Sequence, residues 1–242
     1  MERPSQRVFI TGASSGIGAA TARLLAEQGH QVFATARRQK ALDDLHASLT
    51  ESARSRMVVR SMDVLDVEAH RSAVQECLQA FGGLDVVVPN AGLGRFENMA
   101  TASLEDWHTM VDVNIKGVLN TTHLCLPALI ESRGLIVNIG SVASRNVFPN
   151  SGVYCATKHA VLALGEAVRQ DLKSSVATTT VCPGAVDTAF IEQTRDTALL
   201  DQYRPNFKQG MRPEFIAEHI LMAIECRGRG IVSDITLRPD FL

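Results

Sequence analysis

The sequence has few cysteines, and neither they nor its histidines fall into metal-binding patterns. Its five cysteines are scattered, with no Cys-x-x-Cys pair, so we expect neither a disulfide framework nor a thiolate metal site. The seven histidines show no His-Glu-x-x-His spacing, which argues against a zinc enzyme. Any chemistry of this chain is therefore expected to be metal-free.

Long hydrophobic runs and basic clusters are also missing. With a net charge of -2, the chain is not expected to bind nucleic acid or an anionic membrane. No apolar stretch approaches the roughly 18 residues of a membrane span, and residues 1–6 are polar, which leaves no room for a signal peptide. We expect one cytoplasmic domain over residues 1–242, because a chain of this length that is 45% apolar can bury a single core.

Short β-branched runs alternate with longer helical stretches along the whole chain. Strands are expected at 7–11, 31–35, 57–61, 85–88, 135–139 and 177–182, and helices at 16–28, 39–50, 67–81, 103–129 and 151–173. Apolar strands separated by helices are typical of a parallel sheet covered on both faces. The pattern predicts an α/β, Rossmann-like, doubly wound domain of about seven strands.

One stretch, about 187–210, is mixed in polarity and contains Pro205. It is expected to be irregular, either as a plain surface loop or as a mobile lid over a ligand crevice. We favour the lid, because long loops in compact domains are usually functional.

A glycine-rich turn links the first strand to the first helix. It reads Thr11-Gly12-Ala13-Ser14-Ser15-Gly16-Ile17-Gly18. Glycines let backbone N–H groups approach a pyrophosphate, and the helix N-terminus adds about half a positive charge. The spacing differs from the usual dinucleotide fingerprint, and a purely structural turn is the alternative. Its place at the first strand–helix junction favours dinucleotide binding.

The second expected strand ends in Ala36-Arg37-Arg38, where an NAD site normally carries an acidic residue. Guanidinium groups bind a 2′-phosphate through charge-assisted hydrogen bonds, whereas a carboxylate would repel it. We therefore predict NADP(H) as the cofactor. The alternative is two solvated arginines at a strand end, which would leave the cofactor undetermined.

Tyr154 and Lys158 are four residues apart on an expected helix, so they share one face. A nearby ammonium lowers a phenol pKa from about 10 toward neutrality, as a general acid or base requires. A chance pairing is the alternative.

Ser141 follows the fifth strand, at the sheet edge where such folds bind ligands, and its hydroxyl can donate to a substrate oxygen or simply cap a turn.

Taken together, these motifs resemble the short-chain dehydrogenase/reductase family along essentially the whole chain. Thr11 to Gly18, Asn90-Ala91-Gly92, Asn114, Gly140-Ser141 with Tyr154 and Lys158, and Pro183-Gly184 with Thr188 follow in the family's order. The resemblance implies that Tyr154 exchanges a proton with the substrate oxygen and that Ser141 holds this oxygen. It also implies that Lys158 tunes Tyr154 and binds the nicotinamide ribose, and that Asn114 positions a relay water.

The resemblance also implies a set of cofactor-binding residues. They are Gly12, Ser14, Ser15, Gly16, Ile17, Gly18, Arg37, Arg38, Asp63, Val64, Asn90, Ala91, Gly92, Tyr154, Lys158, Pro183, Gly184, Val186 and Thr188. Pro89 departs from the family pattern, which has an asparagine there. A proline cannot donate a backbone hydrogen bond, so we expect an unusual end to the fourth strand and intact activity.

Within the family, the chain most resembles an NADP-dependent group that includes serine, 3-hydroxy-acid and clavaldehyde dehydrogenases. A small carbonyl or alcohol substrate is implied, and a 3-hydroxy or 3-oxo acid is one candidate. Arg145, Arg195 and Arg204 could face an acidic substrate, or they could be solvated surface residues. We expect at most one of them to bind substrate.

Two further expectations concern partners and class. Family members commonly form tetramers, and residues 107–129 and 153–168 are apolar on more than one face, which fits a homotetramer or homodimer or simply burial in the core. The main prediction is an NADP(H)-dependent oxidoreductase. A non-catalytic NADP-binding, redox-sensing module is the alternative, and the complete Ser-Tyr-Lys-Asn set favours the enzyme.

Overall fold

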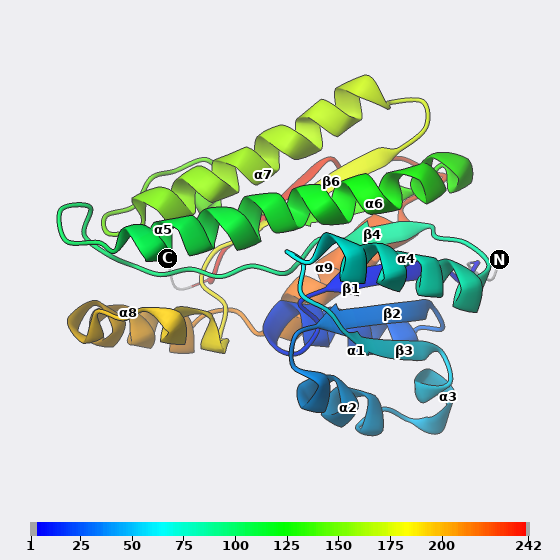
Figure 1. Ribbon diagram of the computed structural model, residues 1–242, viewed down its shortest axis with the longest axis horizontal. Coiled ribbons are helices and arrows are strands. Elements are labelled where there is room, and N and C mark those ends of the chain that lie inside the picture. The colour runs from blue at the N-terminus through cyan, green and yellow to red at the C-terminus, as the bar shows by residue number, and fades with distance from the viewer. Residues whose placement is uncertain (1–3, 241–242) are drawn as a thin grey trace.

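A parallel β-sheet runs through the centre of the computed structural model, which describes residues 4–240 (Figure 1). Residues 1–3 and 241–242, which the predicted domain includes, lie outside the described residues. The strands are β1 (Arg7–Thr11), β2 (Gln31–Ala36), β3 (Met57–Ser61), β4 (Val86–Val88), β5 (Leu135–Ile139), β6 (Ala177–Pro183) and β7 (Asp234–Leu237).

The strand order of this seven-stranded sheet is β3-β2-β1-β4-β5-β6-β7, and every pair is parallel. The chain winds outward on one side from β1 to β3 and then crosses back to β4. The order therefore reverses between β1 and β4, and open α/β sheets bind their ligands beyond the carboxyl ends of the strands at such a point.

Helices cover both faces of the sheet. They are α1 (Gly16–Glu27), α2 (Gln39–Ala47), α3 (Glu51–Arg54), α4 (Val67–Phe81), α5 (Leu104–Val111), α6 (Gly117–Ser132), α7 (Gly152–Asp171), α8 (Thr197–Lys208) and α9 (Pro213–Glu225). Three short helical turns complete the set: the π-helical η1 (Asp112–Lys116) and the 3-10 turns η2 (Val142–Ser144) and η3 (Ala189–Gln193).

Alternating residues of each central strand enter two separate hydrophobic cores. Val8 and Ile10 pack with α1, α2 and α9, whereas Phe9 between them packs with α4 and α6 on the other face. Val87 of β4 likewise faces away from its two neighbours. This two-sided burial explains why the strands are apolar throughout, and it confirms the predicted doubly wound fold.

The helix expected at 103–129 is interrupted. Asp112–Lys116 forms a π-helical turn between α5 and α6, and it carries Asn114. Such one-turn π-bulges occur often at functional sites. Periodicity alone did not reveal the interruption.

The stretch at 187–210 is more regular than expected, since most of it forms η3 and α8. Asp196 caps α8 by accepting hydrogen bonds from the backbone N–H groups of Ala198 and Leu199, both at 3.0 Å. Pro205 lies inside α8 instead of ending it. In Figure 1, α8 extends outward from the body of the domain, beside the carboxyl ends of the strands.

Candidate active site

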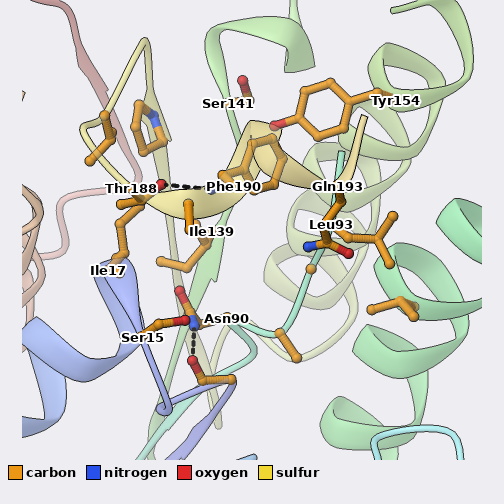
Figure 2. A pocket seen from close by; sticks show the side chains of 18 of the residues that line it. Ser15, Ile17, Asn90, Leu93, Ile139, Ser141, Tyr154, Thr188, Phe190 and Gln193 are labelled. Carbon is orange, nitrogen blue, oxygen red and sulfur yellow. Dashed lines mark hydrogen bonds between the residues drawn. The ribbon is translucent and has the colours of Figure 1, made fainter. Parts of the chain in front are cut away.

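A cavity of about 810 Å³ opens at the carboxyl ends of the central strands. The glycine-rich turn and Arg37 line one end of it, whereas Ser141, Tyr154 and part of α8 line the other. Figure 2 shows this arrangement, with Ser15 and Ile17 on one side and Ser141 and Tyr154 across from them. Segments far apart in the sequence thus meet in one site.

The glycine-rich turn is packed so closely that side chains would not fit at two of its glycines. A Cβ at Gly12, where φ is +70°, would lie 2.8 Å from the Ala91 Cα atom. A Cβ at Gly18 would lie 2.4 Å from the Asn90 Nδ2 atom. These glycines let β1, α1 and the segment after β4 come together beside the cavity.

The N-terminus of α1 lacks the features that normally neutralise a helix end. Ser15 at the N-cap makes no side-chain capping bond, and the first turn has no acidic residue. The free backbone N–H groups and the helix dipole therefore leave positive potential where Gly16 and Ile17 line the cavity. This is a site that fits an anion such as the pyrophosphate of a dinucleotide.

Two arginines stand beside this helix end. The Arg38 guanidinium donates hydrogen bonds to the Ser14 hydroxyl at 3.0 Å and to the Ser15 hydroxyl at 2.9 Å. Arg37 is exposed, and both arginines line the cavity. Asp63 and Val64, which follow β3, line the same end. The positive charge next to the turn fits a phosphate group, as the sequence predicts.

Thr11 joins β1 to the segment after β4. Its buried hydroxyl accepts hydrogen bonds from the backbone N–H groups of Asn90 and Ala91, both at 3.1 Å. The Asn90 side chain donates back to the Thr11 carbonyl at 2.9 Å. Pro89 directly follows the last paired residue of β4, Val88. The missing N–H of Pro89 therefore falls where the strand already ends, and the Asn-Ala-Gly segment stays anchored.

Tyr154 and Ser141 lie together deep in the cavity. Both are 8% exposed, and Figure 2 shows the Tyr154 hydroxyl directed toward Ser141. Burial raises the pKa of Tyr154 to about 12, although a hydrogen bond with the Ser141 side chain acts in the opposite direction. This differs from the lowered pKa expected from the sequence. The phenol holds its proton at neutral pH, which suits a proton donor.

Lys158 lies one helical turn beyond Tyr154 on α7. Its ammonium is 5.9 Å from the centre of the Tyr154 ring and donates a hydrogen bond to the Ile139 carbonyl at 2.8 Å. The side chain is buried, and this desolvation lowers the pKa of Lys158 to about 8. Because the ammonium is directed to a backbone carbonyl, its effect on Tyr154 is weaker than helical spacing alone suggested.

Asn114 is 1% exposed and lies just behind the cavity wall. Its amide donates to the Leu93 carbonyl at 2.8 Å and to the Thr157 hydroxyl at 3.1 Å, and its oxygen accepts from the Leu93 N–H at 2.8 Å. A Cβ at Gly92 would lie 3.2 Å from the Asn114 oxygen and 3.8 Å from the Lys158 nitrogen. Asn114 and Lys158 therefore flank the same glycine.

The structure brings almost all of the predicted site residues to this one cavity. Pro183, Gly184, Val186 and Thr188 line it next to Ile139, at the carboxyl ends of β5 and β6. Of the predicted residues, Gly18 and Asn114 are not part of the lining, because the first packs under the turn and the second lies behind Leu93. The proximity of the remaining residues supports one shared binding site.

Sequence reasoning missed the aromatic wall of the cavity. Phe96, Phe148, Phe190 and Phe207 all line it, together with Tyr154 and Tyr203. These residues come from four separate segments, and no single motif contains them. The one available signal was the spacing of Tyr203 and Phe207, which places both rings on one face of α8.

The three candidate substrate arginines all form ion pairs, and none lines the cavity. Arg145 pairs with Asp234, and Arg204 pairs with Glu192 at 2.9 Å. Arg195 pairs at 3.0 Å with Asp106, a fully buried carboxylate that also pairs with Arg95. These pairs join segments of the fold around the cavity.

Neither a membrane span nor a metal centre is found in the described part of the chain. No helix there is long and apolar enough to cross a membrane. Residues 4–240 also contain no group of three or more histidine, cysteine, aspartate or glutamate side chains placed to hold a metal ion.

Comparison with known proteins identifies the family. The family model described as short chain dehydrogenase matches residues 6–199. An uncharacterized oxidoreductase of Staphylococcus saprophyticus is 35% identical over 237 residues, which cover 96% of this chain and 95% of that protein. The chain therefore belongs to the short-chain dehydrogenase family, and it is an oxidoreductase of that type.

Solved structures agree with this assignment. The closed form of serine dehydrogenase complexed with NADP+ is 31% identical, with a TM-score of 0.85, over 97% of this chain and 95% of that one. A short chain dehydrogenase/reductase of Burkholderia phymatum in complex with NAD is 26% identical, with a TM-score of 0.87, over 98% and 90% of the two chains. Since these two structures hold different cofactors, the preference for NADP(H) stays a prediction.

Proposed function

We propose that this protein is an NADP(H)-dependent oxidoreductase that interconverts a small carbonyl compound and its alcohol. The observation that carries this proposal is the shared cavity: the Ser141 and Tyr154 hydroxyls lie at one end, and the glycine-rich turn with its open helix N-terminus lies at the other. A nicotinamide cofactor supplies or accepts the hydride when it is bound.

The reacting oxygen would bind between the two hydroxyl groups. Ser141 would donate a hydrogen bond to the carbonyl oxygen and polarise it, while Tyr154 would deliver its proton to the same oxygen as the carbon receives the hydride. The raised pKa of Tyr154, about 12, keeps this proton available at neutral pH. In the oxidation direction, the reverse step would need the phenolate form of Tyr154, which would take the proton of the alcohol.

Lys158 and Asn114 would support this proton transfer. The Lys158 ammonium is close enough to stabilise negative charge that develops on the Tyr154 oxygen, and it can also donate to a ribose hydroxyl. Asn114, which faces the same side of Gly92 as Lys158, would position a water molecule that links the lysine to solvent.

The cofactor would lie along the carboxyl ends of the strands. Its pyrophosphate fits the N-terminus of α1, its 2′-phosphate fits Arg37 and Arg38, and its adenine fits the wall at Asp63 and Val64. The Asn-Ala-Gly segment would contact the adenosine ribose. Pro183, Gly184, Val186 and Thr188 would hold the nicotinamide ring beside Tyr154.

The test is to mix the purified protein with NADPH and a panel of aldehydes and ketones. The proposal predicts loss of NADPH absorbance with formation of an equal amount of the alcohol. Tight binding of NADPH without turnover of any carbonyl compound would instead support the non-catalytic, redox-sensing module. Failure to bind NADPH would contradict both functions.

We also propose a homotetramer or homodimer that forms through α6 and α7. Leu119 and Ile130 on α6 are 44% and 42% exposed. Between these helices lies a cavity of about 350 Å³, lined by apolar side chains that include Leu126, Leu164 and Val168. A second copy would cover this surface. Sedimentation velocity at micromolar concentration should show a dimer or tetramer, and a monomer would contradict the assignment.

A further inference from the structure

The cavity differs in chemical character at its two ends. Arg37, Arg38 and Asp63 give one end its charge. Beyond Tyr154, aromatic rings are prominent in the lining of the other end, which also includes the polar side chains of Gln193 and Asn206. The chain has nine phenylalanines and two tyrosines, and four of the former and both of the latter line this one cavity. Such a concentration indicates a surface built for an apolar ligand.

Phe96 is the centre of this aromatic wall. Its ring centre lies 5.3 Å from that of Tyr203 and 6.1 Å from those of Tyr154 and Phe207. Phe190 also packs against Tyr154, with 5.5 Å between ring centres. The ring of the proposed proton donor therefore contacts two phenylalanines, and the substrate end of the cavity continues into the rings on α8.

Helix α8 contributes Tyr203, Asn206 and Phe207 to this end of the cavity. The Tyr203 hydroxyl donates a hydrogen bond to the Pro149 carbonyl, and the Asn150 amide donates to the Tyr203 hydroxyl, both at 3.4 Å. These contacts tie α8 to the loop after β5 and satisfy the polar atom of Tyr203. Phe148, in the same loop, is 45% exposed and extends the apolar surface to the outside.

Positive charge is already neutralised around the aromatic end. Among the described residues that line the cavity beyond the cofactor end, the charged side chains are Lys158 and Glu192. Lys158 is directed to the Ile139 carbonyl, and Glu192 is itself a carboxylate, held by Arg204. A substrate carboxylate bound here would lose its hydration water and lie near the Glu192 carboxylate. Among the described residues that line this end, no guanidinium could form an ion pair with it.

We propose that the substrate is a neutral carbonyl compound with an apolar body about the size of an aromatic ring. Its carbonyl oxygen lies at Ser141 and Tyr154, and its body packs among Phe96, Phe190 and Phe207. This inference rests on the proposed oxidoreductase activity and names its substrate class. It favours a neutral substrate over the 3-oxo acid that the sequence resemblance put forward.

A matched series of substrates tests this proposal, because the reacting ketone is the same in each. The series is benzyl 3-oxobutanoate, ethyl 3-oxobutanoate and the 3-oxobutanoate anion, each with NADPH. We expect kcat/KM to be highest for the benzyl ester, with an advantage of about 100-fold or more over the anion. Equal or better turnover of the anion would overturn the substrate class while leaving the proposed function intact.

Failure of both esters would overturn the substrate class, and failure of the whole carbonyl panel would overturn the proposed function as well.

A pair of variants on α8 makes the test independent of absolute activity. Phe207→Arg places a cation at the half-buried wall, and it should shift the ester-to-anion ratio of kcat/KM toward the anion by about tenfold. Phe207→Leu should keep the preference for the esters. An unchanged ratio in Phe207→Arg would show that this ring does not contact the substrate.

Discussion

The Lys158 ammonium lies one helical turn beyond Tyr154 and 5.9 Å from the centre of its ring. Both side chains are buried, and burial shifts their pKa values in opposite directions, because it disfavours a phenolate and an ammonium alike. The pair therefore holds a protonated phenol beside a lysine that titrates much closer to neutrality. In this protonation state, Tyr154 can deliver a proton to a carbonyl oxygen.

The pH dependence of kcat/KM for NADPH should follow the titration of Lys158. The value of kcat/KM for NADPH reports groups in the free enzyme, where the pKa of Lys158 is about 8 and that of Tyr154 about 12. We expect a plateau below the Lys158 pKa and a fall of about tenfold per pH unit above it, because the neutral amine loses its charge while Tyr154 stays protonated.

Lys158→Met should give a low kcat/KM for NADPH that does not fall further at high pH. Lys116→Met should keep the wild-type pH profile. Lys116 is an exposed residue paired with Asp112, so it serves as the matched control. A fall that persists in Lys158→Met would assign the titration to another group.

Cofactor preference should depend on the two arginines beside the glycine-rich turn. The double variant Arg37→Asp, Arg38→Leu should weaken NADPH binding by about 30- to 1,000-fold, since charge-assisted hydrogen bonds to the 2′-phosphate would be lost. NADH binding should change far less. Fluorescence titration with both cofactors measures the ratio.

This ratio separates phosphate recognition from a general loosening of the turn, which Arg38 also holds through Ser14 and Ser15. Lys40→Leu, at an exposed lysine outside the cavity lining, is the control and should leave both affinities unchanged. Equal weakening of NADPH and NADH would refute the phosphate-binding role.

Asp106 should be the most important acidic residue for the stability of the substrate end. Its carboxylate is fully buried and pairs with both Arg95 and Arg195, so Asp106→Ala removes the ion-pair partner of the largely buried Arg95, whose side chain is 17% exposed. We expect the free energy of unfolding to fall by about 3–5 kcal/mol. Asp112→Ala, which removes an exposed i,i+4 pair with Lys116, should cost about 0–1 kcal/mol. Urea unfolding compares the two, and similar losses would contradict this account.

Much of the fold was predictable from local patterns. Runs such as Val86–Val88 are apolar on both faces, as two-sided burial requires, and strand ends then place motifs along one edge of the sheet. That is why Ser141 and Tyr154, with the glycine-rich turn, could be assigned to one cavity from the sequence. The family motifs added the residues after β4 and β6.

Other features depend on packing between distant segments and have no local signal. The π-helical turn at Asn114 differs from an ordinary helix by one inserted residue. The hydrogen bond from Lys158 to Ile139, and the burial that raises the Tyr154 pKa, arise only when α7 packs on β5. Phe96 and Phe207 meet because α8 packs against the segment after β4, which no short pattern records.

The role of Tyr154 is tested most directly by removing its hydroxyl and comparing the result with the chain's other tyrosine. Tyr154→Phe should lower kcat for NADPH-dependent carbonyl reduction by about 100- to 10,000-fold, with the Kd for NADPH changed only slightly. Tyr203→Phe, which loses a hydroxyl that contacts Pro149, should retain most of its turnover. Undiminished kcat in Tyr154→Phe would contradict the assignment of this phenol as the proton donor.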